Sequence, residues 1–132
     1  MSLYTKCILH PREDRDGRRI SVMSRHTLAD GITPDLRITA DVFDEWYHIL
    51  APQDTLVGAY YKRGLSWEDF ALQYLASLRK NRHAEKVKKF AERAFAIDIT
   101  LLCIEETSEH CHRGLLAEEC QLYVPELYVE HR

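Results

Sequence analysis

The chain has 132 residues, of which 45% are hydrophobic and 30% are charged, and this composition is ordinary for a globular domain with its own hydrophobic core. The formal charge of -3 at pH 7 argues against a general polyanion binder but leaves room for a local basic face. No apolar run reaches the roughly 18 residues of a membrane-spanning helix, and the first residues lack the apolar core of a signal peptide. We therefore expect a single cytoplasmic α/β domain over residues 1–132.

The first half of the chain is predicted to contain two strands and two helices. Apolar and β-branched residues favour strands at 3–9 and 20–24, and the charged segment 11–19 between them is typical of a solvated turn. Thr39 is a candidate cap for a helix over 40–50, in which apolar residues recur at the helical period. Pro52 is expected to start a short helix that ends near Gly64.

The second half gives clearer signals. Ser66 precedes apolar residues at i, i+3 and i+4 spacing from Trp67 to Leu78, which predicts a capped helix. A further helix is expected over 83–96, a buried central strand over 97–104, a helix over 111–122 and a last strand over 127–129. This order predicts an α/β fold with a small, mostly parallel sheet of about four strands, flanked by helices, and with a helical insertion between the second and third strands.

The stretch from Leu101 to Arg113 carries the strongest functional signal. Cys103 and Glu105 mark the end of the predicted central strand, and Cys111 opens the helix that follows. Ligands of open α/β sheets bind outside the carboxyl ends of the strands. The sequence therefore places a candidate site at this edge of the sheet.

The residue types at this edge suit nucleophilic chemistry. A helix N-terminus and the charge of Arg113 would both favour the thiolate of Cys111, the form that attacks electrophiles. His112 would then move a proton, and Glu105 would orient His112 or an arginine. In the competing interpretation Cys111 caps the helix and packs inward, His112 and Arg113 are solvated, and Glu105 faces solvent or caps the turn.

A second group of residues follows the second predicted strand. If that strand is a parallel neighbour of the central one, Arg25 and His26 reach the same edge as Cys111 and its neighbours. Such a pocket, with Arg25, His26, Arg113 and Cys103 as ligand-binding residues, would suit an anionic small molecule or a nucleotide. The alternative for Arg25 is a salt bridge to Glu105 or Asp30. The sequence implies no cofactor.

The four cysteines are expected to be reduced, because they lack the dense spacing of a disulfide framework. Cys103 could still approach Cys111 across the loop as a redox pair, although no C-x-x-C motif is present. A metal ion would need ligands among Cys103, Glu105, His110, Cys111 and His112. Adjacent residues at a helix start point about 100° apart, so Cys111 and His112 are not expected to share an ion, and no metal site is predicted.

Nucleic-acid binding, in a non-catalytic or repair-associated module, is one alternative function, and metal binding around Cys103 and Cys111 is another. Tyr60 to Gly64 mixes aromatic and basic residues, and the run from Arg79 to Arg93 holds seven Lys or Arg. Both are also typical of an ordinary helix end and a solvated helix face, so this function is not favoured. Exposed aromatics such as Trp46 and Tyr128 are compatible with an oligomer. No membrane partner is expected.

Three blocks of the chain resemble domain-of-unknown-function family 488, the YeaO-like proteins. They are Arg19 to Thr27 with Asp30-Gly31, Tyr60 to Trp67, and Cys103-Ile104-Glu105 with Cys111-His112-Arg113. They follow in family order, and the cysteine block is the most specific. Relatives often carry Pro-Glu where this chain has Ser108-Glu109-His110. The resemblance implies a small cytoplasmic α/β domain and points to six residues, but to no particular reaction: Arg25, Cys103, Glu105, Cys111, His112 and Arg113.

Overall fold

The computed structural model describes residues 1–132 and is built on one sheet in which all neighbouring strands run parallel. The strands lie in the spatial order β3-β2-β4-β1-β5, which places β4 at the centre. Their bounds are β1 (Ser2–Cys7), β2 (Arg18–Ser21), β3 (Glu45–Trp46), β4 (Ile99–Cys103) and β5 (Tyr128–His131). The predicted α/β class with a small parallel sheet is confirmed, and β3 is the strand that the sequence pattern did not indicate.

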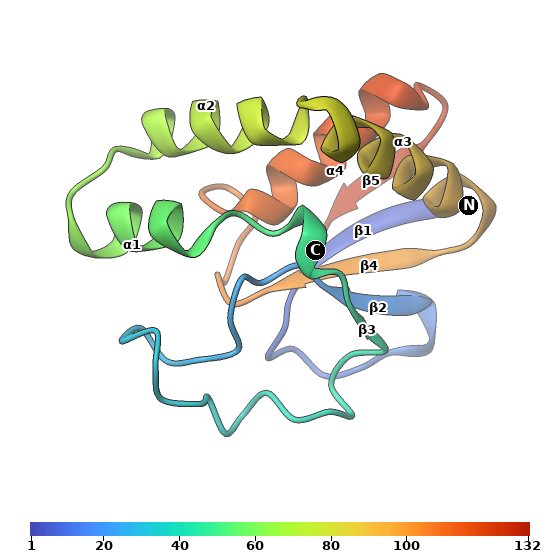
Figure 1. Ribbon diagram of the computed structural model, residues 1–132. Coiled ribbons are helices and arrows are strands. Elements are labelled where there is room, and N and C mark those ends of the chain that lie inside the picture. The colour runs from blue at the N-terminus through green and yellow to red at the C-terminus, as the bar shows by residue number, and fades with distance from the viewer.

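The four helices are α1 (Asp54–Lys62), α2 (Trp67–Leu78), α3 (Asn81–Ala96) and α4 (His112–Tyr123). Helices α2, α3 and α4 lie over one face of the sheet, and α1 lies beyond the ends of the strands (Figure 1). Helices α3 and α4 contact the strands. Helix α2 packs on α3 and α4, and α1 packs on α2. The first three helices form the helical insertion predicted before the central strand. No helix of the fold combines the length and apolar character needed to cross a membrane.

The helix predicted over 40–50 is wrong. The chain there is irregular, apart from β3 and a short 3-10 turn at His48–Leu50. Its backbone amides pair with β2 instead: the amide of Asp44 donates to the Arg19 carbonyl at 2.7 Å, and that of Tyr47 to the Ser21 carbonyl at 2.9 Å. Pairing with a distant strand has therefore replaced the local helical bonds that the apolar period suggested.

The two faces of the sheet bury different side chains. Leu3, Ile20 and Leu101 point toward the helices and join the main apolar core. Because side chains alternate along a strand, Lys6, Arg19 and Thr100 point the other way. They nevertheless remain 4% exposed or less, because the irregular segments 8–17 and 22–44 cover this second face.

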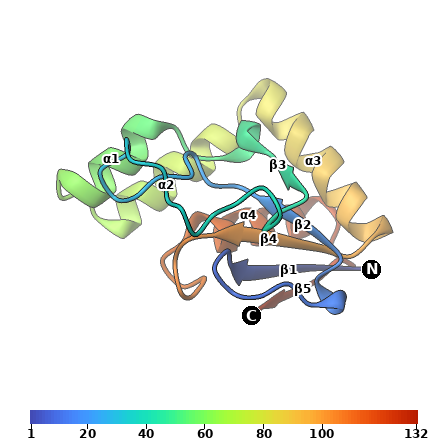
Figure 2. The same cartoon turned by 90° about the horizontal axis from the view of Figure 1, so that it is seen from below.

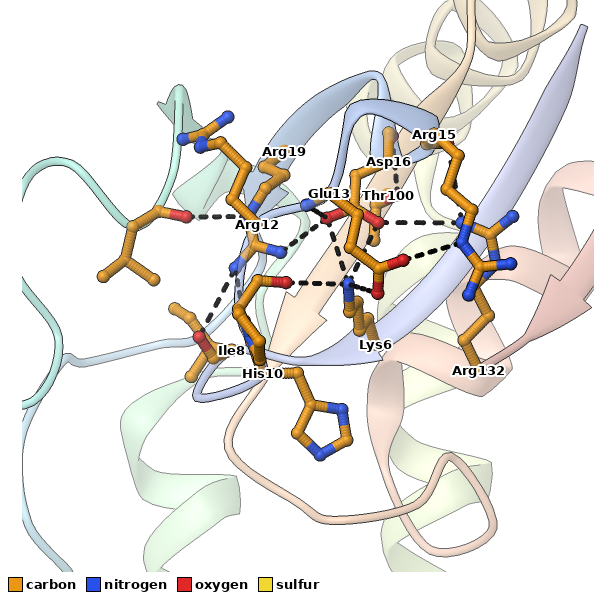
Figure 3. Close-up of polar contacts among 12 residues, drawn as sticks. Lys6, Ile8, His10, Arg12, Glu13, Arg15, Asp16, Arg19, Thr100 and Arg132 are labelled. Carbon is orange, nitrogen blue, oxygen red and sulfur yellow. Dashed lines mark hydrogen bonds and ion pairs between the residues drawn. The ribbon is translucent and has the colours of Figure 1, made fainter.

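A network of charges centred on Asp16 holds the second face (Figure 3). The Asp16 carboxylate accepts from Arg19 Nη1 at 2.8 Å and from Lys6 Nζ at 3.1 Å. Thr100 Oγ1 donates to the Asp16 carbonyl at 2.7 Å, which ties the loop to β4. The expectation of a solvated turn over 11–19 is therefore wrong for Asp16 and Arg19, which are fully buried.

The segment between β2 and β3 also shapes the edge of the sheet where the strands end. Figure 2 shows it on the side toward which the arrowheads of β1 and β4 point, next to α1. Contacts fix this placement, since Arg25 Nη2 lies 2.8 Å from Asp54 Oδ2 and Lys62 Nζ donates to the Asp30 carbonyl at 3.0 Å. A hollow bounded by loop and helix thus forms at the carboxyl edge.

Candidate functional site

A cavity of about 590 Å³ opens at the carboxyl edge of the sheet. It lies between the segment after β2, helix α1, the start of α2 and the loop from β4 to α4. Its volume falls within the range of small-molecule sites. Cys103, Cys111 and His112 are among the buried residues of its lining.

Cys103 is the last residue of β4, and its surroundings favour its thiolate. Contact with the Cys111 thiol is the largest cause that lowers the pKa of Cys103. Burial acts in the opposite direction, but the charge of Arg113 and the amides of Ile104 and Glu105 add to the lowering, so the net pKa lies below its ordinary value. The side chain is only 4% exposed, and what is exposed faces the cavity.

His112 is held in one tautomer by the end of β2. Its Nε2 lies 2.6 Å from the carbonyl oxygen of Val22, and since a carbonyl only accepts, Nε2 carries the proton. The lone pair of the neutral ring is then on Nδ1, which lies 3.8 Å from Cys103 Sγ. His112 is thus placed to take the proton of the Cys103 thiol.

Cys111 is the N-cap of α4, as predicted, but its thiol state is the opposite of the expected one. It packs in a small apolar cluster with Ile8, Met23 and Leu102. Burial, followed by contact with Cys103, raises its pKa well above the ordinary value. The desolvation of the side chain outweighs the helix N-terminus, so the favoured thiolate is that of Cys103.

Arg113 is completely buried and has no carboxylate partner. Its Nη1 donates to the Glu105 carbonyl at 2.8 Å and to Cys111 Sγ at 3.3 Å, while Nε and Nη2 have no partner. A guanidinium stays protonated, and a buried charge is costly unless it is compensated. The charge of Arg113 also lowers the pKa of Cys103, so that a thiolate at Cys103 would compensate it.

Aromatic rings form one wall of the cavity. Trp67 stacks on His110 with ring centroids 5.1 Å apart, and on Phe70 at 5.4 Å. Tyr60 meets Trp67 and Phe70 at 5.8 Å and 5.2 Å. All four residues line the cavity. Such a wall suits a planar, unsaturated group of a ligand.

Charged groups surround the outer part of the cavity. Arg25 pairs with Asp54 and also donates to the Gly31 carbonyl at 2.6 Å, so its predicted partners Glu105 and Asp30 are both wrong. Glu105 instead accepts a hydrogen bond from the hydroxyl of Tyr61. The cavity-lining cations outnumber the acids by one, with four cations (Arg25, Arg37, Lys62 and Arg63) against three acids (Asp35, Asp54 and Glu105).

The structure brings most of the predicted site residues together. Five of them line the cavity: Arg25, Cys103, Glu105, Cys111 and His112. Arg113 lies behind the cysteines and contacts Cys111 rather than the cavity. His26 does not join the site, because its ring packs on Trp46 and Phe43 and its Nε2 bonds to Ser21 Oγ at 2.7 Å.

Two clusters at this edge are candidates for a metal: Cys103, Cys111 and His112 in the cavity lining, and Cys7, His10 and Glu106 outside it. The donor atoms of Cys103, Cys111 and His112 all lie within 4.8 Å of one another, closer than the helix geometry led us to expect. Three ligands with an open position resemble a catalytic zinc site. The guanidinium of Arg113, however, donates to one of the two sulfurs, and its buried positive charge opposes a divalent cation.

The basic run from Arg79 to Arg93 is partly occupied by ion pairs within the fold. Arg79 forms two bonds with Glu119, and Arg93 forms two with Glu45. Arg79 thereby joins the end of α2 to α4, and Arg93 joins α3 to β3. Fewer cations of this run are therefore free for a phosphate backbone than the sequence suggested.

Sequence reasoning missed the stacking partners of the cavity. Trp67 was assigned only to the apolar stripe of α2, and His110 only to a metal set. The block Tyr60 to Trp67, which carries the family resemblance, was the signal that could have drawn attention to them. The buried state of Arg113 had no local signal, because it depends on how the loop from β4 to α4 folds over it.

The fold and the site define a small parallel α/β protein with thiol, imidazole and guanidinium groups at the carboxyl edge of its sheet. A family model described as the active DUF488-N3 subclade matches residues 3–123. The chain therefore belongs to the DUF488 family, as the resemblance of its three motif blocks indicated. Comparison with curated proteins and with solved structures found no match.

Proposed function

We propose that the protein is a thiol-dependent enzyme that acts on an anionic small molecule or a nucleotide, with Cys103 as the nucleophile. One observation carries the proposal. Cys103, with its lowered pKa, lies 3.8 Å from Nδ1 of His112 at the buried end of a cavity, and the charge of the buried Arg113, which has no carboxylate partner, favours its thiolate. The description of the family model as an active subclade is consistent with an enzyme.

Each side chain then has a distinct task. His112 takes the proton from Cys103, and the sulfur attacks an electrophilic centre of the bound ligand. Arg113 and the amides after β4 stabilise the thiolate. Cys111, which the sequence analysis proposed as the nucleophile, contributes as a contact to Cys103. Glu105 positions Arg113 through its main-chain carbonyl.

The ligand class follows from the cavity walls. A planar ring can stack on Trp67 beside His110, and an anionic group can meet Arg25 or Lys62 at the outer part of the lining. A nucleotide combines these two features in one molecule. His26 has no place in this arrangement, since it packs away from the cavity.

Paired alkylating agents test the proposal. Iodoacetate is anionic and iodoacetamide is neutral. The rate of Cys103 alkylation by iodoacetate is divided by the rate with iodoacetamide, and this ratio is compared with the same ratio for free cysteine. The resulting relative ratio measures how well the site accepts an anion at the thiol. We expect this relative ratio to be above one and to fall in Arg25→Gln. The exposed Arg82→Gln on α3 is the matched control and should leave it unchanged. Protection of Cys103 by adenosine monophosphate would support a nucleotide.

Three outcomes would contradict the proposal. A relative ratio at or below one in the wild-type protein would show that the thiol does not sit in an anion-accepting site. Failure of Cys103 to react with either agent under native conditions would remove the nucleophile itself. Zinc bound at one equivalent after purification without an affinity tag would likewise replace the free thiolate with a metal centre.

A further inference from the structure

The site contains a second thiol that the proposed function uses only as a contact. Cys111 Sγ and Cys103 Sγ lie within 4.8 Å of each other, and both residues belong to the buried part of the cavity lining. Arg113 contacts Cys111 directly. Cysteines that react with peroxides share these features: a stabilised thiolate, access from solvent and a second cysteine near it.

We propose that Cys103 and Cys111 form a redox pair that reduces small hydroperoxides, with Cys103 as the attacking thiol and Cys111 as the resolving thiol. The proposal rests on the reactive Cys103 of the proposed function but adds an activity to it. Both thiols line the cavity, and Cys103 is the first attacker because His112 Nδ1 lies 3.8 Å from its sulfur. Cys111, held among apolar side chains at the start of α4, stays protonated until the second step.

The chemistry balances in two steps. In the first step the Cys103 thiolate attacks the outer oxygen of an alkyl hydroperoxide and the O–O bond breaks, so that Cys103 becomes a sulfenic acid. The alkoxide that leaves takes up the proton that Cys103 had released. The Cys111 thiol then attacks that sulfur, an S–S bond replaces the S–O bond, and water leaves with the proton of Cys111. The peroxide gains two electrons from the two thiols, and an external dithiol restores them.

Local structure makes the second step feasible. A disulfide brings the sulfurs to about 2 Å, so the two side chains have to close the remaining gap. Cys111 is the N-cap residue and ends the irregular loop 104–111, where the backbone is not held in a strand or helix. A ring nitrogen of His112 lies within 4.8 Å of both sulfurs and can relay the proton of Cys111 to the departing hydroxide, which leaves as water.

Cys7 is the competing partner and must be separated from Cys111. It pairs in register with Cys103 on the neighbouring strand β1. Its thiol, however, donates to the Ile104 carbonyl at 3.5 Å, and it does not line the cavity. Trypsin distinguishes the two partners, because it leaves Cys103 and Cys111 on one peptide, residues 94–113, and Cys7 on another, residues 7–12.

The test is disulfide mapping of the full chain after treatment with one equivalent of cumene hydroperoxide. We expect peptide 94–113 to lose two hydrogens, and Cys111→Ser to accumulate a sulfenic acid at Cys103 that dimedone traps. Cys120→Ala should behave as the wild type, since burial raises the pKa of Cys120 to about 12 and it takes no part in the site. The dithiol-reduced protein should show the original mass again.

Three results would overturn the pair of Cys103 and Cys111, and they bear differently on the proposed function. If Cys103 is alkylated readily but neither a disulfide nor a sulfenic acid forms, the redox pair is wrong and the nucleophilic thiol stands. If Cys103 resists both alkylation and oxidation, both proposals fail. A disulfide that joins peptides 7–12 and 94–113 would assign the resolving role to Cys7 and refute the part given to Cys111.

Discussion

Asp16 offers the sharpest test of how the second face of the sheet is held. Its buried carboxylate binds Lys6 and Arg19 at 3.1 Å and 2.8 Å, and both cations are almost completely buried. In the variant Asp16→Asn these two charges lose their shared counter-charge. Removal of one partner of a buried ion pair typically costs about 3–5 kcal/mol.

The expected magnitude lies at the lower end of that range. Lys6 keeps the Glu13 carboxylate at 3.1 Å, and Arg19 keeps the carbonyls of Val42 and His10. We therefore expect Asp16→Asn to lower the free energy of unfolding by about 3 kcal/mol, measured by urea denaturation. For a chain of this size the melting temperature should fall by about 10 °C. Asp14→Asn, an exposed neighbour in the same turn, should change stability by less than about 0.5 kcal/mol.

The same carboxylate predicts a pH dependence. Burial by itself raises the pKa of Asp16, but hydrogen bonds from the Glu13 amide, Arg19 and Lys6 outweigh it and lower the pKa below its ordinary value. A lowered folded pKa stabilises the fold above the unfolded value of about 3.9 and loses this effect as the pH falls through the folded value. The stability difference between wild type and Asp16→Asn should therefore shrink below about pH 4. A difference that is small at pH 7, or constant down to pH 3, would refute the buried ion pair.

Two further predictions concern α4. A Cβ at Gly114 would lie 2.8 Å from the Ser108 carbonyl oxygen, so Gly114→Ala should push the loop before α4 outward. We expect this variant to lower the free energy of unfolding by about 1–3 kcal/mol and to slow the alkylation of Cys103. An unchanged midpoint of urea denaturation would contradict this contact. Glu119 accepts two bonds from the half-exposed Arg79 at 2.8 and 2.9 Å, so Glu119→Gln should cost about 1 kcal/mol in urea denaturation. The exposed Glu118→Gln is its control, and equal effects in both variants would argue against the ion pair.

The parts of the fold that depend on local signals could be predicted. Helix α2 begins after Ser66, whose side chain accepts from the Asp69 amide at 3.1 Å, as the sequence pattern indicated. The segment 40–50 also carries a helical period, yet it forms β3 because its amides bond to Arg19 and Ser21 of β2. Periodicity reports which side chains are apolar, and only the folded chain decides which strand they meet.

The candidate site likewise has features that could be predicted from the sequence and features that could not. The position of Cys111 at the start of α4 follows from sequence, as does the approach of Arg25 to this edge once β2 and β4 are parallel neighbours. The upward shift of the Cys111 pKa could not be predicted from the sequence, because it depends on the apolar residues that bury the thiol in the folded chain. His26 was misplaced for a related reason: Trp46 of the unexpected strand β3 packs against its ring.

The most direct test of the central claim is the pH dependence of iodoacetamide labelling at each cysteine, resolved by fragmentation of the peptide 94–113. Cys103 should titrate below the ordinary thiol value of about 8.5, and Cys111 should label more slowly at every pH below that value. In Cys111→Ala the pKa of Cys103 should rise, because its largest stabilising contact is lost. Faster labelling of Cys111 than of Cys103, or a Cys103 pKa at or above the ordinary value, would contradict the assignment of Cys103 as the nucleophile.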